Sequence, residues 1–251
     1  MLAGVRDRDA SGSQRPRPAG GGRAAASCGE ARRRLSGRIG PAAATLFDGR
    51  GVERPFQAGA RLARRDEAGN EVLVVLHGIV GLYRAGQDAA SGAGVLGYCG
   101  CGDLIAPAGP GDAWGFDAKA VSDGTLLALS LPEVRGSTSG KPDLLWPLFE
   151  MACAELVGRT ARLRGQWALP VKARLADFLF ELEEAVGEPS DKGLILHVPM
   201  FRDEIADYLG TRTETICRIL TRWREEGLIV MDTPRVLVIP DRARLRADAF
   251  A

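Results

Sequence analysis

The stretch FRDEIADYLG at residues 201–210, followed by TRT at 211–213 and ETICRILTRWREE at 214–226, decides the fold of this 251-residue chain. Its apolar spacing predicts two short amphipathic helices, with Gly210 as the stop signal of the first and Thr213 as the N-cap of the second. The side of the second helix that we expect to be buried carries Ile216, Ile219, Leu220 and Trp223. Two helices joined by about three residues form a helix-turn-helix.

A β-hairpin is predicted directly after the two helices. Its strands are Leu228–Met231 and Arg235–Ile239, and Asp232–Pro234 form the turn between them. A hairpin in this place is the wing of a winged helix-turn-helix, and it strengthens the prediction made from the helices.

The second helix carries a polar face that is suited to base-pair edges. Glu214, Cys217 and Arg218 follow each other at i, i+3 and i+4, so they lie on one side. In the major groove, Arg pairs with guanine and a carboxylate accepts from cytosine, while outer Arg side chains neutralise phosphates. A solvated helix face is the alternative, and the agreement of helix, turn and hairpin argues against it. The predicted DNA contacts are Arg212, Thr213, Glu214, Thr215, Cys217, Arg218 and Arg222.

Residues 45–135 predict a β-rich domain. Short apolar runs bounded by glycines recur about every 8–12 residues, which is typical of a sandwich or barrel. The runs are 61–65, 72–76, 79–84, 95–98, 104–105, 118–121 and 125–131.

Three motifs in this domain suggest small-molecule chemistry, and each has a simpler structural explanation. Gly92-x-Gly94-x-x-Gly97 has the spacing of a dinucleotide fingerprint, but no helix start follows it, so glycines in a hairpin are favoured. Cys99-x-Cys101 lacks a second pair of metal ligands nearby. His77 ends a strand before Gly78, where a turn residue is more common than a haem ligand.

Residues 136–140 predict a flexible joint, and two helices follow it. The first helix, over 142–169, has apolar residues spaced by four and three, as in a coiled-coil seam. It either packs on its own domain or forms a homodimer seam, for which we expect Leu145, Phe149, Ala152, Leu156 and Leu163. Pro170 ends this helix, and Val171–Ala185 form the next.

Composition narrows the classes of function. With 33 basic and 32 acidic residues, a net charge of +1 and 45% hydrophobic residues, the chain is not wholly disordered. No apolar run reaches the length that spans a membrane, and two widely separated His exclude a multi-His metal site. Five scattered Cys favour a reducing compartment, so we expect a cytoplasmic protein. Residues 1–44 predict a disordered basic tail, with a nucleic-acid arm or a transit peptide as alternatives.

Over about residues 46–248, the chain resembles the Crp/Fnr family of bacterial transcription regulators, most closely its Fnr/FixK-like branch. The motifs that carry the resemblance are Asp203–Gly210, Glu214–Arg218, Glu225–Ile229 and the glycine-aspartate turn in Gly97–Leu104. The resemblance implies an α+β fold. Its parts are a cyclic-nucleotide-binding-like β-roll at 45–135, a long dimerisation helix at 142–169 and a winged helix-turn-helix domain at 170–251.

The family also implies function. Its members bind palindromic promoter sites as dimers, and in this branch the pattern Glu-x-x-Ser-Arg reads TTGAY-type half-sites. Glu214 and Arg218 match that pattern, whereas Cys217 stands where Ser is usual. We therefore expect a homodimeric DNA-binding regulator, an activator with RNA polymerase as partner, and no enzyme. Cys217 is either a near-isosteric substitute for Ser or a redox switch that replaces the family's iron–sulfur sensor.

The positions at which the chain departs from the family limit which signals the protein could sense. Cyclic-AMP-responsive members use a Glu and an Arg, but here Asp103 replaces the Glu and no Arg lies between Arg84 and Arg135. Lys119 lacks the bidentate fork of Arg, so a cyclic nucleotide is not expected. Cys28 alone near the N-terminus excludes a four-thiolate cluster. We expect no cofactor. The alternatives are an effector-gated regulator whose β-roll binds haem or another small molecule, and a β-barrel enzyme, for which the sequence lacks a nucleophile motif.

Overall fold

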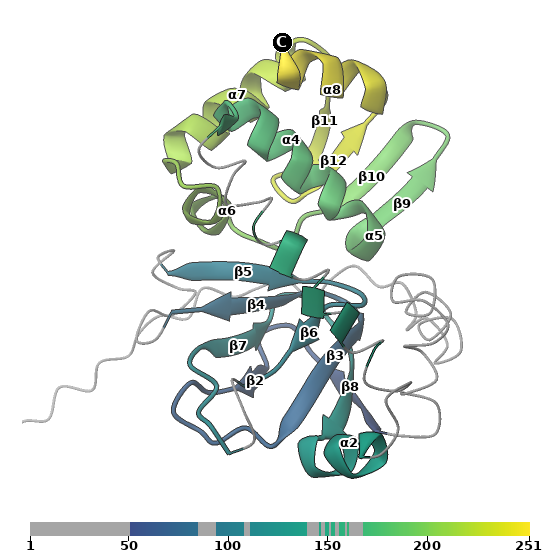
Figure 1. The fold of residues 1–251 in the computed structure, drawn as a ribbon. Coiled ribbons are helices and arrows are strands. Elements are labelled where there is room, and N and C mark those ends of the chain that lie inside the picture. Colours follow the sequence, from purple (N-terminus) through teal and green to yellow (C-terminus); the bar gives the residue numbers. More distant parts are fainter. Residues whose placement is uncertain are drawn as a thin grey trace, which may run out of the picture.

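The computed structural model describes residues 51–84, 94–107, 111–139, 168–251 and nine positions between 146 and 160, namely 146, 149, 150, 152, 153, 156, 157, 158 and 160 (Figure 1). The predicted tail at 1–44, Gly92, Leu145 and Leu163 lie outside these residues.

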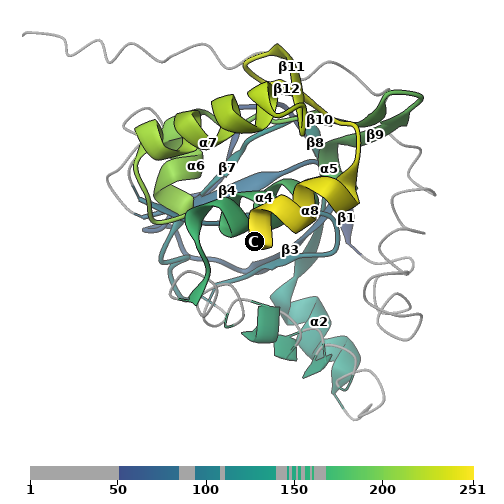
Figure 2. The ribbon, with the colours of Figure 1, turned by 90° about the horizontal axis from the view of Figure 1, so that it is seen from above.

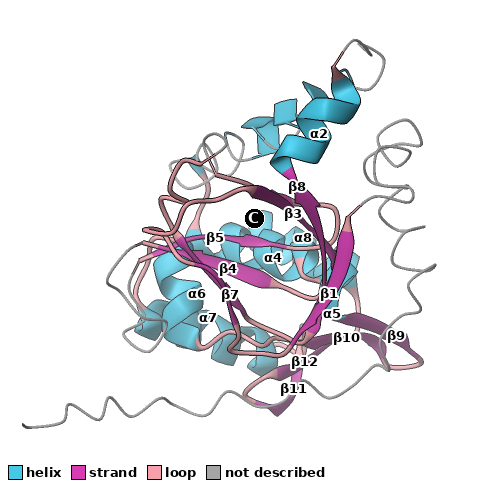
Figure 3. Cartoon of the chain, turned by 90° about the horizontal axis from the view of Figure 1, so that it is seen from below, coloured by secondary structure: helices cyan, strands magenta, loops and turns pink. Residues whose placement is uncertain are grey.

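The N-terminal half of the described chain forms a β-roll of two four-stranded antiparallel sheets (Figures 1 and 3). In chain order its strands are β1 (Val52–Phe56), β2 (Arg61–Ala63), β3 (Glu71–His77), β4 (Val80–Tyr83), β5 (Val95–Cys99), β6 (Leu104–Ile105), β7 (Asp117–Ala120) and β8 (Gly124–Ser130). The strand orders are β1-β8-β3-β6 and β2-β7-β4-β5. Alternate side chains, such as Leu73 and Val75 of β3 and Val80 and Leu82 of β4, form the core between the sheets. The predicted β-rich architecture is confirmed.

The two described glycines of the motif, Gly94 and Gly97, belong to the hairpin of β4 and β5. Strands β4 and β5 pair antiparallel, Gly94 has a φ of +93°, and Gly97 lies within β5. The next element among the described residues is strand β6, not a helix. The hairpin explanation of this motif is therefore confirmed.

The predicted joint after the roll is partly wrong. Leu131–Thr138 form helix α2, which includes Gly136. Pro132 lies in the first turn, where its missing N–H costs no helical hydrogen bond. The described positions between 146 and 160 are helical, in agreement with the helix that we predict there.

The C-terminal domain packs helices against a third antiparallel sheet, in the order β11-β12-β10-β9. Its elements are α4 (Val171–Glu181), α5 (Glu183–Val186), β9 (Gly187–Ser190), β10 (Gly193–His197), α6 (Arg202–Tyr208), α7 (Thr213–Glu225), β11 (Val230–Thr233), β12 (Val236–Ile239) and α8 (Arg242–Phe250). The helix predicted over 171–185 is divided at Leu182, and the sequence analysis missed β9, β10 and α8. Among the described residues, no helix is long and apolar enough to cross a membrane, and no cluster of His, Cys, Asp and Glu fits a metal ion.

Candidate nucleic-acid interface

Helix α7 divides into a buried face and an exposed face. Ile216, Leu220 and Trp223 are buried in the domain core, as predicted, and Ile219 is partly buried. The predicted contact residues lie together on the other side and at the start of this helix. Arg212, Glu214, Cys217, Arg218 and Arg222 are exposed, whereas Thr213 and Thr215 are half-buried.

The start of α7 differs in one detail from the prediction. Thr213 is the first helical residue and not the N-cap; Arg212 occupies the N-cap position, and its side chain accepts no capping hydrogen bond. Arg212 has an extended backbone and directly precedes the first turn of α7, whose free N–H groups favour anions. This end of α7 therefore combines a guanidinium with helix N–H groups, which suits a phosphate oxygen.

The turn between α6 and α7 is fixed from two sides. Gly210 has a φ of +61°, a conformation that a residue with a Cβ adopts at a cost. The N–H of Thr211 donates to the Ala206 carbonyl at 2.9 Å and closes the end of α6. From α4, the guanidinium of Arg174 donates to the carbonyl of Leu209. The angle between α6 and α7 is therefore set by a glycine and by a neighbouring helix.

The buried face of α7 is anchored through Asp248 of α8. Trp223 Nε1 donates to Asp248 Oδ2 at 2.8 Å, and Lys172 Nζ of α4 donates to the Asp248 carbonyl at 2.6 Å. Seen from above, α8 lies beside α4, and α7 lies beside α6 (Figure 2). One residue of the last helix thus connects three helices and holds α7 in place.

Arg202, which the sequence analysis did not single out, links α6 to the wing. Its Nη2 donates to the carbonyl of Pro234 in the β11–β12 turn at 2.6 Å. Burial lowers the pKa of Arg202; its interaction with the Cys217 sulfur opposes this shift, and the charge of Arg235 adds to it. Arg235 in turn lies 4.2 Å above the ring of Phe201. These partners are far apart in sequence, so no periodicity indicates them.

The cations on the exposed face of α7 have different surroundings. Arg222 Nε contacts Glu226 Oε1 at 2.8 Å, and this hydrogen bond raises the pKa of Arg222 above its usual value. Within the described parts of the chain, Arg218 makes no ion pair, and its side chain is exposed. Arg218 is therefore ready to pair with a base edge, while Arg222 is held along the helix.

Comparisons with known proteins agree with this geometry. The model of the Crp-like helix-turn-helix domain matches residues 173–248. The nitrogen fixation regulation protein FixK of Azorhizobium caulinodans is 26% identical over 197 residues, which are 78% of each chain. The transcriptional activatory protein AadR of Rhodopseudomonas palustris is 24% identical over 221 residues, 86% of this chain and 88% of that protein. The solved structure of FixK2 from Bradyrhizobium japonicum aligns with a TM-score of 0.66 at 22% identity and covers 80% of this chain and 98% of that one.

A β-roll joined to a winged helix-turn-helix, with a polar and basic face exposed on its second helix, defines a DNA-binding regulator of transcription. Residues 173–248 form a Crp-like helix-turn-helix domain, and most of the chain is similar to transcription regulators such as FixK and AadR. Such proteins regulate transcription and are not enzymes, as the sequence analysis predicted.

Proposed function

We propose that the protein is a cytoplasmic homodimer that binds a palindrome of TTGAY-type half-sites and activates transcription together with RNA polymerase. The observation that carries this proposal is the exposed face of α7, on which Glu214 and Arg218 lie one turn apart with Cys217 between them. A carboxylate and a guanidinium at this separation match a donor and an acceptor on neighbouring base pairs of the major groove.

The proposed dimer rests on apolar side chains that a single chain leaves in water. Phe149 and Leu156, two residues of the predicted seam, are 58% and 66% exposed, and Ala152 is exposed as well. Large apolar side chains gathered on one exposed helix are typical of an interaction surface. A second copy of the same helix would cover them in a parallel seam.

A gel shift tests the DNA site. The full-length protein is titrated onto a TTGAY palindrome and onto the same DNA with its half-sites scrambled, at 50 and 200 mM salt. We expect roughly a thousandfold or greater preference for the palindrome, as for other specific regulators. Equal affinities for the two DNAs would overturn the proposal.

We further propose that oxidation of Cys217 reduces DNA binding. Cys217 is exposed on the recognition face, next to the exposed Arg218 in the sequence. One peroxide molecule transfers an oxygen to the sulfur to give the sulfenic acid, and a second gives the sulfinic acid, with one water released in each step; the sulfinate places an anion beside the DNA phosphates. Peroxide treatment is therefore expected to weaken the gel shift of the native protein and to spare that of Cys217→Ser. Equal losses in the two proteins would refute the switch.

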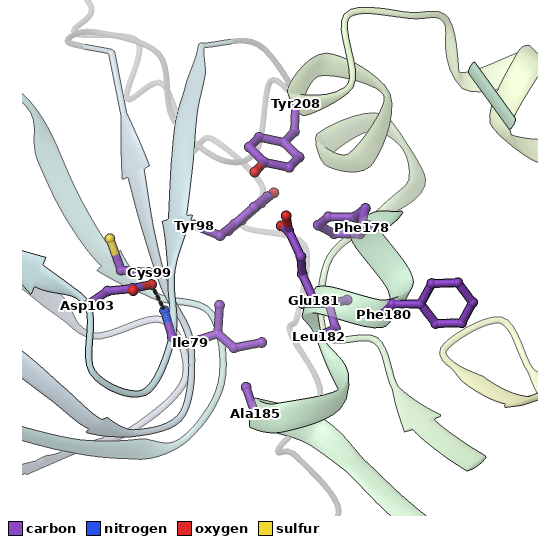
Figure 4. Close-up of a pocket in the computed structure, with 11 residues that line it drawn as sticks. Ile79, Tyr98, Cys99, Asp103, Phe178, Phe180, Glu181, Leu182, Ala185 and Tyr208 are labelled. Carbon is purple, nitrogen blue, oxygen red and sulfur yellow. Dashed lines mark hydrogen bonds between the residues drawn. The ribbon is translucent and has the colours of Figure 1, made fainter. Parts of the chain in front are cut away.

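The second candidate is an effector-gated regulator, and the size of one cavity tests whether it could hold a small molecule. The cavity, of about 240 Å³, lies between the roll and α4 and is lined by Ile79, Tyr98, Asp103, Glu181 and Leu182, among others (Figure 4). Its volume is below the roughly 300–1,000 Å³ of most small-molecule sites. The size of this cavity therefore argues against haem as its ligand. Haem absorbance of the purified protein would contradict this conclusion.

A further inference from the structure

The cavity between the β-roll and α4, about 240 Å³ in volume, is lined by parts of both domains (Figure 4). The roll contributes Ile79 from the β3–β4 turn, the end of β5 and the turn that follows β5. The C-terminal domain contributes the last turn of α4, together with residues of α5 and α6. None of the described residues in the lining belongs to α7, so a ligand held in the cavity would leave the DNA interface uncovered.

The charged side chains in the lining are acidic. Asp103 lies in the turn after β5, where its Oδ2 accepts from the backbone N–H of Gly100 at 2.7 Å, and Glu181 ends α4. The two carboxylates come from opposite walls, Asp103 from the roll and Glu181 from the C-terminal domain (Figure 4). Of the described residues that line the cavity, none is Lys, Arg or His. A cavity with this lining attracts a cation and repels a phosphate.

The end of α4 adds to the negative potential of the cavity. The C-terminal end of a helix carries partial negative charge, which repels a carboxylate and stabilises a cation. Glu181 is the last residue of α4, and the last turn of this helix contains no basic residue. The Glu181 carboxylate is therefore not explained by the stability of α4, whereas a cation in the cavity would be attracted by both the helix end and the side chain.

Three aromatic rings lie next to the Glu181 carboxylate, which points toward them (Figure 4). The ring centroid of Tyr98 lies 6.0 Å from that of Phe178 and 5.0 Å from that of Tyr208, and the latter two lie 5.4 Å apart. The rings are tilted by 48° to 66° against one another, so their faces are not covered by parallel stacking. The face of an aromatic ring carries negative partial charge and attracts a cation that lies within about 6 Å of its centroid.

The remaining lining and the volume favour an organic cation over a metal ion. Calcium and magnesium ions take six or more oxygen ligands, and the described residues contain no group of three His, Cys, Asp or Glu that could hold a metal. Ile79, Leu182 and Ala185 instead present apolar surface, which suits carbon atoms. Because the volume is below that of most small-molecule sites, the ligand has only a few carbon atoms.

We propose that this cavity binds a small organic cation of the quaternary ammonium class, for which choline is the probe. Aromatic rings recognise such cations because the positive charge is spread over methyl groups that contact the ring faces. The carboxylates of Glu181 and Asp103 balance the charge. This inference rests on the second candidate function, the effector-gated regulator, and names its ligand class. The test uses no DNA, so the ligand site can fail while the proposed DNA site holds.

Calorimetry of the full-length protein measures the binding. Choline chloride is titrated at constant ionic strength, with sodium chloride as the balancing salt. The neutral control is 3,3-dimethylbutan-1-ol, which has carbon in place of the nitrogen. We expect choline to bind at least about tenfold more tightly than the alcohol, since the two have the same shape and only choline is charged. The N-methyl proton resonance of choline should also move upfield, because ring faces shield the protons above them.

Variants locate the bound ammonium group. Glu181→Gln keeps the shape of an exposed side chain and removes its charge, so it should weaken choline binding about tenfold. Tyr208→Leu removes one half-buried ring, so it should weaken choline binding severalfold and reduce the upfield shift. Asp191→Asn makes the same change of net charge in the exposed β9–β10 turn, outside the cavity. This matched control should bind choline as the wild type does.

The proposal would be overturned by equal affinities for choline and the alcohol, or by no choline binding against the sodium background. An affinity for choline in Glu181→Gln equal to that of Asp191→Asn would also overturn it. If Tyr208→Leu is not folded by circular dichroism, Glu181→Gln decides, because loss of a negative charge from the end of α4 should not destabilise the helix.

The ligand site and the DNA site are separated by the pattern of results. A protein that binds choline but no TTGAY palindrome would support the ligand site and overturn the proposed function. A protein that binds the palindrome but not choline would support the proposed function and overturn the ligand site.

Discussion

Arg218 and Arg222 lie one turn apart on α7, and their surroundings assign them different tasks. Arg218→Ala removes the side chain that we propose to pair with guanine, so it should cost about 1–3 kcal/mol of binding and relax the preference at one base pair. The measurement is a set of dissociation constants for DNAs that carry each base at each half-site position. A variant with full affinity and full specificity would contradict the assignment of α7 as recognition helix.

Arg222→Ala is the matched control for Arg218→Ala. Arg222 is paired with Glu226 and lies further along the helix, where phosphates are the expected partners. Its loss should weaken binding to all sequences alike and lower the slope of log K against log salt by about one. A change in base preference in this variant would contradict its role as a phosphate contact.

Whether a residue of the interface could be predicted depends on how far its partner lies from it in the sequence. Glu214, Cys217 and Arg218 were predictable, because helical periodicity brings neighbours at i, i+3 and i+4 to one side. Arg202 and Asp248 were not, since each acts on a partner from another element that only the folded chain brings near. Sequence patterns report local geometry, and these two residues depend on tertiary packing.

At the scale of elements, Gly210 decides the angle of the helix-turn-helix. Gly210→Ala forces a Cβ into left-handed backbone and should lower the free energy of unfolding by about 1–2 kcal/mol. Gly136→Ala is the control, because Gly136 lies in helix α2 with nothing within 4 Å of the added methyl, where alanine should stabilise by about 0.5–1 kcal/mol. Denaturant unfolding measures both, and shifts of the same sign would contradict the argument.

Helix α4 carries a pH-dependent element of stability at Asp177. Burial raises the pKa of its carboxyl above the usual value, and the charge of Arg246 only partly offsets this. The unfolded chain keeps the lower pKa, so stability is lost as pH rises from the unfolded to the folded pKa. Asp177→Asn should therefore raise Tm at pH 7 and give no gain near pH 3. Asp191→Asn controls for net charge, and a gain that is equal at both pH values would argue against this origin.

The elements also show why some predictions failed. Apolar runs of β-branched residues indicated the strands of the roll correctly. Helix α8 escaped notice because RARLRADAF buries only Leu245 and Ala249, too few for a clear apolar period, although Asp241 is a usable N-cap signal. Strands β9 and β10 are short, and GEPS in β9 has little β-propensity without its partner in the sheet.

At the scale of the whole molecule, the proposed dimer depends on the exposed helix. Leu156→Glu places an unpaired charge in the seam, which burial disfavours, so the variant should sediment as a monomer and lose palindrome binding. Val157→Glu adds the same charge one residue away, at a position that is 68% exposed and outside the seam pattern. This control should remain dimeric, and a dimer in both variants would refute the seam.

The anchoring of three helices by Asp248 has a consequence for how the chain is made. Lys172 and Trp223 leave the ribosome before α8, and neither has its partner until Asp248 emerges. During that interval, the apolar side of α4 that later packs on Leu245 and Ala249 is uncovered. Translation proceeds at about 5–20 residues per second, so this apolar surface stays exposed for seconds and can bind chaperones during that time. We expect nascent chains that stop before α8 to be held by chaperones and not to bind DNA.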